Sequence, residues 1–346
     1  MSSILSFYVT YNRLNYIIDS NFKNSNKVYN NCNLIIDLSS SLNSLYYNKI
    51  YMKKNEYLNI EILKDILNMI AHYKFGFKKY NINLNFYFIY SNNNPKTSTD
   101  FYPYYNTNMK LIKSNNSMIT NSISSSLKLF QKIWKFLDKC NYIKSENDSS
   151  HIVYKIIEDR LNDNDLNIIL TKDPVMYQNI YKDNIIIIRP FKDVKEKKDI
   201  SYIINNNNKF EYLLKSYNLS KNIENLNIKF NKDRNAITSM MVLSGVRQRS
   251  YNKLFKVNET IEIFNKYCEL YNTKNIIPID LFKSFKENSL SEELNNRWKA
   301  IDAKYNYNII NDIFEYDVIK LVDREFLYKL NDKYFNGEVK VDEISN

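Results

Sequence analysis

The sequence predicts an α/β protein: a central, mostly parallel β-sheet flanked by helices, followed by a helical C-terminal region. Up to about residue 190, short apolar runs that end in polar residues alternate with amphipathic stretches, which is typical of parallel strands joined by crossover helices. From about residue 210 onward the chain reads as helical. Its 346 residues suffice for one large domain or two modest ones, each with a buried core.

The first strand and helix follow an N-terminal extension over residues 1–30, which is polar and aromatic. The stretch "CNLIIDLSSSLNSLYY" contains a strand over 34–36, an aspartate at its end and a serine-rich helix start. Residues 58–75 place apolar side chains at helical spacing. Residues 82–95 form a second apolar run that ends in a polar turn, and they predict the second strand.

The next segment, 106–126, is polar and has no clear period, so we expect an arch or a mobile loop there. Amphipathic helices are predicted over 127–140 and 145–161, and buried strands over 166–171 and 184–190. The α/β core therefore spans 31–235 and the helical region 236–346, which opens with a helix over 236–255 interrupted near Gly245. Beyond about residue 275 we find amphipathic helices and no chemical motif.

The amino-acid composition indicates which kind of partner and which location to expect. The formal net charge of +11 indicates a polyanionic partner such as nucleic acid, although an excess of codons rich in A and T also explains the many Lys, Asn and Ile residues. No apolar run approaches the ~20 residues of a membrane helix, and no signal peptide opens the chain. We expect a soluble intracellular protein, in the cytoplasm, the nucleoid or a viral replication site, with no membrane partner.

Several kinds of site are excluded by the scarcity or spacing of their residues. With three glycines, scattered along the chain, no glycine-rich phosphate loop can form. The cysteines match no disulfide or zinc spacing. The two histidines lie alone in helix-like stretches, so neither a metal site nor a catalytic site centred on histidine is expected. These residues are Gly76, Gly245, Gly337, Cys32, Cys140, Cys268, His72 and His151.

Four acids fall at the end of a predicted strand or the start of a predicted helix: Asp37, Glu146, Asp148 and Asp173. Such positions can bring carboxylates together above one edge of a parallel sheet. Clustered carboxylates repel one another unless cations lie between them, and Mg²⁺ is the usual choice. The alternative, for any one of these residues, is that its carboxylate caps a helix N-terminus.

The order of these stretches resembles the 5′-nuclease family, which comprises flap endonucleases, phage 5′-3′ exonucleases and related PIN-like proteins. "LIIDLSSSLNSLYY" resembles the family's first strand with its Asp, and "FYFIYSNNNP" followed by "FYPYYNTNM" resembles the second strand and the Y-P-x-Y-K-x-x-R segment. "SENDSSHIVYKIIED" is similar to E-A-D-D and its helix, and "LTKDPVMYQ" to T-G-D-K-D-L-x-Q. "MMVLSGVRQRSYNKLF" is similar to the L-x-G-D-x-x-D-N segment before the helix-hairpin-helix-like DNA clamp. The matches run in order over about residues 33–265.

The departures from the family pattern remove about half of its metal ligands. No acid stands at the place of the second-strand Asp, about Tyr90–Asn92, and Ser149 and Val175 replace two further acids. By resemblance the catalytic and metal-binding residues are therefore Asp37, Glu146, Asp148 and Asp173. They imply one Mg²⁺ or Mn²⁺ at most, or none.

The region of the clamp also departs from the family. Arg247 and Arg249 stand where carboxylates are expected, and we hypothesise that one guanidinium takes the second metal's place and pairs with Asp173 or Asp148. The alternative is that both are ordinary surface arginines. Because the clamp has no glycines, phosphate contact falls to side chains, and the expected nucleic-acid-binding residues are Arg247, Arg249, Asn252, Lys253 and Lys256.

Two functions remain open at this point. The first is a divergent 5′-nuclease-like DNA-binding protein; if active, it is a metal-dependent phosphodiesterase of the 5′-3′ exonuclease or flap endonuclease type. The second is a catalytically inactive nuclease-fold protein that acts as a DNA-binding or structural scaffold. RNA in place of DNA also stays open.

Overall fold

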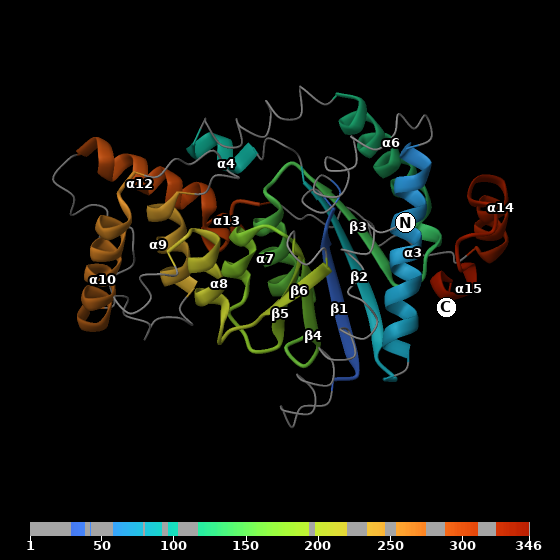
Figure 1. Ribbon diagram of the computed structural model, residues 1–346, viewed down its shortest axis with the longest axis horizontal. Helices are drawn as coiled ribbons and strands as arrows, with labels where there is room; N and C mark the ends of the chain where they lie inside the picture. Colours follow the sequence, from blue (N-terminus) through green and yellow to red (C-terminus); the bar gives the residue numbers. More distant parts are fainter. Residues whose placement is uncertain are drawn as a thin grey trace.

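The structure is a computed structural model. It describes residues 29–38, 42, 58–78, 80–91, 96–102, 117–193, 198–219, 234–245, 254–274, 288–310 and 323–345. The predicted fold class is confirmed: a six-stranded sheet in the order β3-β2-β1-β4-β5-β6 lies between layers of helices (Figure 1). In the described part of the chain, no helix has the length and apolar character needed to cross a lipid bilayer.

The sheet is parallel except at one edge. Strands β1 (Asn31–Asp37), β2 (Asn83–Ser91), β3 (Cys140–Ser145), β4 (Leu166–Leu170) and β5 (Ile185–Asp193) pair in parallel, and β6 (Lys198–Ile204) pairs antiparallel with β5. In the centre, Ile36 lies beside both Phe88 and Leu170. The carboxyl ends of the parallel strands consequently meet at one edge, with β1 in the middle.

One face of the sheet packs against helices α3 (Leu58–Lys78) and α6 (Ser117–Ile133). The even-numbered residues of β1, such as Leu34, point to this face because side chains alternate along a strand. Helices α14 (Arg324–Phe335) and α15 (Val341–Ile344) lie on the outer side of α3 (Figure 1). The Lys74 ammonium of α3 donates to the carbonyl oxygen of Ile344 at 3.2 Å.

The other face of the sheet, to which Ile35 points, belongs to a second hydrophobic cluster that continues into helices of the core and of the helical region. These are α7 (Ser149–Arg160), the 3₁₀ helix η2 (Pro174–Asn179), α8 (Lys209–Ser216), α9 (Arg234–Ser244), α10 (Val257–Lys274) and α12 (Asn288–Ile301). Two short helices complete the described part, α4 (Lys96–Phe101) and α13 (Ala303–Tyr307), which contact α12 and α7 respectively.

Several element predictions need correction. Residues 117–126, expected within an arch or mobile loop, begin α6, because Ile123 and Leu127 pack in the core and the Ser126 hydroxyl bonds the Ser122 and Asn59 carbonyls. The predicted helix over 127–140 ends at the 3₁₀ helix η1 (Trp134–Phe136), and Cys140 begins β3, which was not predicted. The interruption predicted near Gly245 is observed: α9 ends at Ser244, and Gly245 has a φ of 74°, whereas residues 246–253 lie outside the described residues.

The proposed boundary between residues 235 and 236 lies inside α9. Parts of other predictions, including residues 1–28 of the N-terminal extension and 103–116 of the arch, lie outside the described residues.

Candidate functional site

The carboxyl edge of the sheet contains a topological switch point between β1 and β4. The helices that follow β1 and β2 cover one face, whereas α7, which leads into β4, covers the other. Open α/β sheets bind their ligands outside such a point, where the crossovers diverge. Asp37 is the last residue of β1, and Asp173 follows β4 by three residues, so both lie at this point as the sequence predicts.

Asp37 is fully buried and faces α7. The hydroxyl of Ser149, the first residue of α7, donates a hydrogen bond to its Oδ2 atom at 3.3 Å. Ser149 occupies the position of the last acid in the E-A-D-D-like stretch, so a neutral hydroxyl contacts Asp37 where the family pattern has a second carboxylate. The strand end and the helix start therefore do come together, although they are 112 residues apart in the chain.

Asp148 and Asp173 are also buried, and each caps the helix that follows it. Asp148 Oδ1 accepts from the backbone N–H of Ser150 at 2.8 Å and from its hydroxyl at 2.6 Å. Asp173 Oδ1 accepts from the Val175 N–H at 3.0 Å. These bonds satisfy N–H groups that helix N-termini leave without an intrahelical partner. One oxygen of each carboxylate therefore caps a helix, which is the alternative that the sequence left open for these residues.

The remaining positions around the edge carry little negative charge. Glu146 is exposed, unlike the other three predicted acids. Tyr90 stands at the expected place of the second-strand acid, and burial raises the pKa of its phenol above the ordinary value of 10.0. Ser91 and Ser145, paired at the ends of β2 and β3, add hydroxyl groups.

Within the described residues, the predicted acids are not gathered into a cluster of three that could hold a metal ion. Mg²⁺ and Mn²⁺ need several oxygen ligands converging on one point. Within the described ranges, no three His, Cys, Asp or Glu side chains are gathered so that they could hold an ion together. One oxygen of Asp148 and one of Asp173 are already engaged by backbone N–H groups.

Most of the predicted nucleic-acid-binding residues, Arg247, Arg249, Asn252 and Lys253, lie outside the described residues, and so does the proposed pairing of an arginine with Asp173 or Asp148. Lys256 is described and exposed. It precedes α10, and its backbone N–H donates to Glu259 Oε2 at 2.9 Å, which is half of a capping box. Lys256 therefore lies at the N-terminus of α10, and its role in nucleic-acid binding stays a prediction.

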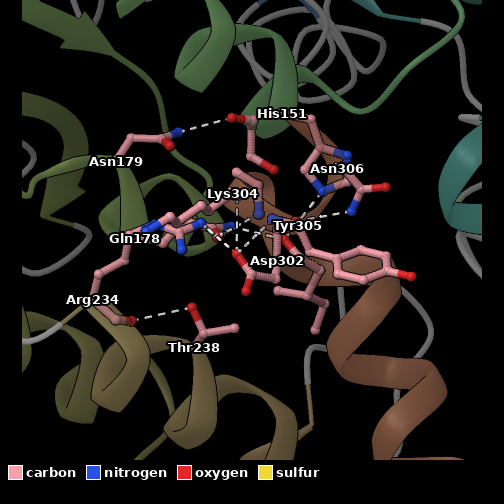
Figure 2. A network of polar contacts seen from close by, with 12 residues as sticks. His151, Gln178, Asn179, Arg234, Thr238, Asp302, Lys304, Tyr305 and Asn306 are labelled. Carbon is pink, nitrogen blue, oxygen red and sulfur yellow. Dashed lines mark hydrogen bonds and ion pairs between the residues drawn. The ribbon is translucent and has the colours of Figure 1, made fainter. Parts of the chain in front are cut away.

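A buried polar network ties the elements that carry Asp148 and Asp173 to the helical region (Figure 2). Arg234 of α9 forms an ion pair with Asp302 Oδ1 at 2.5 Å and donates to Gln178 Oε1 at 3.2 Å. Gln178, from η2, also accepts from the Ala303 N–H at 2.9 Å and donates to the Ile301 carbonyl at 3.0 Å. His151 of α7 lies 3.1 Å from the same carbonyl. We call this group the polar clamp.

Sequence reasoning missed the polar clamp. Its one signal was Gln178, which ends the T-G-D-K-D-L-x-Q-like stretch, whereas Arg234 and Asp302 belong to no motif. In the structure, Arg234 also stacks on Tyr154 of α7, with 4.9 Å between the guanidinium carbon and the ring centroid. His151 is fully buried in α7.

Comparison with known proteins gives matches among solved structures. No family model matches the chain, and no curated protein matches it. The chain is similar to a flap endonuclease of bacteriophage T5 in a product complex with DNA and metal ions, at 9% identity and a TM-score of 0.48 over 91% of this chain and 96% of that one. It is also similar to the T5 5′-exonuclease with bound zinc, at 11% identity and a TM-score of 0.49 over 91% of this chain and 100% of that one.

Proposed function

We propose that the protein binds DNA at the carboxyl edge of its sheet as a 5′-nuclease-like protein that does not hydrolyse it. The observation that carries the proposal is the contact between Ser149 and Asp37. It places a hydroxyl against the central carboxylate, at the position where the resembled family has a further acid. The chain retains the order of the resembled motifs and the topological switch point. It does not retain the full set of acidic side chains that bind metal ions in the resembled family.

The basic character of the chain supports the binding part of the proposal. A net charge of +11 favours association with a polyanion through release of counterions. DNA is preferred over RNA because the ordered motifs resemble enzymes that act on DNA. Binding of this kind weakens steeply as salt is added.

The test is a pair of assays on labelled nicked and flapped duplex DNA. We expect salt-sensitive binding in the presence of EDTA and no cleavage with either Mg²⁺ or Mn²⁺. The substitution Asp37→Ala should likewise give no cleavage and should leave the DNA intact, as the wild type does. A matched single-stranded RNA competitor tests the preference for DNA.

A metal-dependent nuclease with a reduced site is the second candidate. The observation in its favour is that Asp37, Asp148 and Asp173 are all buried near one edge of the sheet. Cleavage by the wild type that Asp37→Ala abolishes would establish this candidate and overturn the first. The substitution Ser149→Asp serves as a further comparison, since it restores the acid of the family pattern beside Asp37.

A further inference from the structure

Helix α6 lies beside α3 (Figure 1), and its exposed residues include lysines. Lys128 and Lys132 lie one helical turn apart, and Lys135 follows in η1; all three are exposed. The opposite side of α6 is apolar and packs in the core through Leu127 and Phe130. We call Lys128, Lys132 and Lys135 the lysine row.

Few acids lie near the row in the sequence; the nearest is Asp138, whose carboxylate lies 3.7 Å from the Lys74 ammonium. Residues 101–137 include no Asp or Glu, although 38 acids are distributed over the chain. Within α6, the neighbouring exposed side chains are neutral and polar, Asn121 and Ser125 among them. Positive charge and hydrogen-bond donors therefore occupy the same exposed side of one helix.

Lysines on other helices are arranged differently. Lys155, Lys215 and Lys329 each form an ion pair with an acid four residues away on the same helix, at 3.1, 2.6 and 2.5 Å. Among the residues that the structure describes, no such pair involves the lysine row. A general excess of lysine explains the number of positive charges, but it does not explain an acid-free row on one helix.

We propose that the lysine row binds the phosphate backbone of duplex DNA, as an extension of the binding surface at the carboxyl edge; this inference rests on the proposed function. Because α6 follows β2 and leads into β3, it runs along the flank of the sheet from the carboxyl edge toward the opposite edge, and the lysine row lies in its second half and in η1. Seven residues of helix separate the outer lysines by about 10 Å. Phosphates on one strand of a duplex recur about every 3.4 Å along its axis, so three ammonium groups can reach separate phosphates of one strand.

The test compares two variants of equal net charge. One neutralises the row (Lys128→Gln, Lys132→Gln, Lys135→Gln), and the control neutralises lysines elsewhere on the surface (Lys182→Gln, Lys215→Gln, Lys304→Gln). Binding of a fluorescent duplex is measured by anisotropy at several salt concentrations, and thermal unfolding confirms that both variants fold. Glutamine keeps the helix propensity of lysine.

We expect the row variant to lower the magnitude of the slope of log K against log salt concentration by about 2 to 3, since each lost phosphate contact removes about 0.9. The control should change the slope by less than about 1. Equal losses in both variants, or none in the row variant, would overturn the role of the row and leave the proposed function standing. A wild type that binds no DNA would overturn both the role of the row and the proposed function. The same holds if the protein binds anionic phospholipid vesicles through the row and does not bind DNA.

Discussion

Each acidic residue at the carboxyl edge has a local task that its position in the chain explains. Asp148 and Asp173 directly precede helices, and a carboxylate there bonds the free N–H groups and interacts favourably with the positive end of the helix. Asp37 ends a central strand, so its carboxylate points to the α7 face and meets Ser149. At the scale of single residues, Asp148 and Asp173 therefore match the resembled family motifs and also cap helices.

A substitution at Asp148 separates capping from negative charge. Asp148→Ala should lower the free energy of unfolding by about 1 to 2 kcal/mol, because the Ser150 N–H loses its acceptor. Asp148→Asn should retain most of that stability, since asparagine is an equally good cap. Urea denaturation measures both. If the Asn variant is as unstable as the Ala variant, then it is the charge of Asp148, and not its capping bond, that the fold requires.

At the scale of helices and strands, polar side chains connect neighbouring elements in two places. The first is a row of asparagines across three strands. Asn33 of β1 donates to Asn167 Oδ1 of β4 at 2.9 Å and accepts from Asn85 of β2 at 3.1 Å. Its amide also donates to Asp165 at 3.3 Å. Since these residues are paired in register, the amides favour one alignment of the strands.

Removal of the central amide should be costly. Asn33→Ala leaves the amides of Asn85 and Asn167 without this partner in a buried place, and we expect a loss of about 2 to 4 kcal/mol in the free energy of unfolding. Asn121→Ala, on the exposed side of α6, is the matched control and should change stability by less than about 0.5 kcal/mol. Chemical denaturation of both variants decides the question. A loss at Asn33 as small as that of the control would mean that the amide row does not stabilise the sheet.

The polar clamp is the second such place, and it joins α9 and α13 to η2. Asp302→Ala should lower the free energy of unfolding by about 3 to 5 kcal/mol, because it leaves the buried Arg234 guanidinium without its carboxylate. It also removes the cap of α13. Thermal unfolding of Asp302→Ala and of the pair Asp302→Ala, Arg234→Met measures the effect. The double variant should recover part of the stability, and no recovery would count against a role for the unpaired charge.

At the scale of the whole molecule, the many tyrosines govern stability at high pH. Burial raises the pKa of a widespread set of phenols above the ordinary value of 10.0, namely Tyr29, Tyr87, Tyr90, Tyr142, Tyr154, Tyr177, Tyr181 and Tyr212. Below that pH the phenols are protonated in both the folded and the unfolded chain. Above it, the unfolded chain loses protons that the folded chain keeps, so stability falls as pH rises.

Tyr142→Phe tests this dependence at a residue whose pKa is raised strongly by burial. From about pH 9 to pH 11 the variant should lose less stability than the wild type, by at most about 1.4 kcal/mol for each pH unit above 10. Urea titrations at each pH measure the difference. Parallel curves for the two proteins would show that Tyr142 does not contribute to alkaline unfolding.

Sequence reasoning predicted the central strands because they are buried on both faces and therefore read as uninterrupted apolar runs. It missed β3 and β6, the outer strands of the sheet, where polar residues interrupt the pattern. The carboxyl-edge positions of Asp37 and Asp173 followed from the ends of those apolar runs. The polar clamp could not be predicted, since Gln178 and its partner at Ala303 are 125 residues apart and no periodicity links them.

The contact between α15 and α3 has a consequence for synthesis on the ribosome. This contact joins Lys74 and Ile344, which are 270 residues apart. At typical rates of translation, Ile344 is therefore synthesised on the order of half a minute after Lys74. Throughout that interval the outer side of α3 has no cover from α14 and α15. A nascent chain of this protein is consequently a substrate for chaperones that hold apolar surfaces, and pausing of translation before residue 323 should lengthen that association.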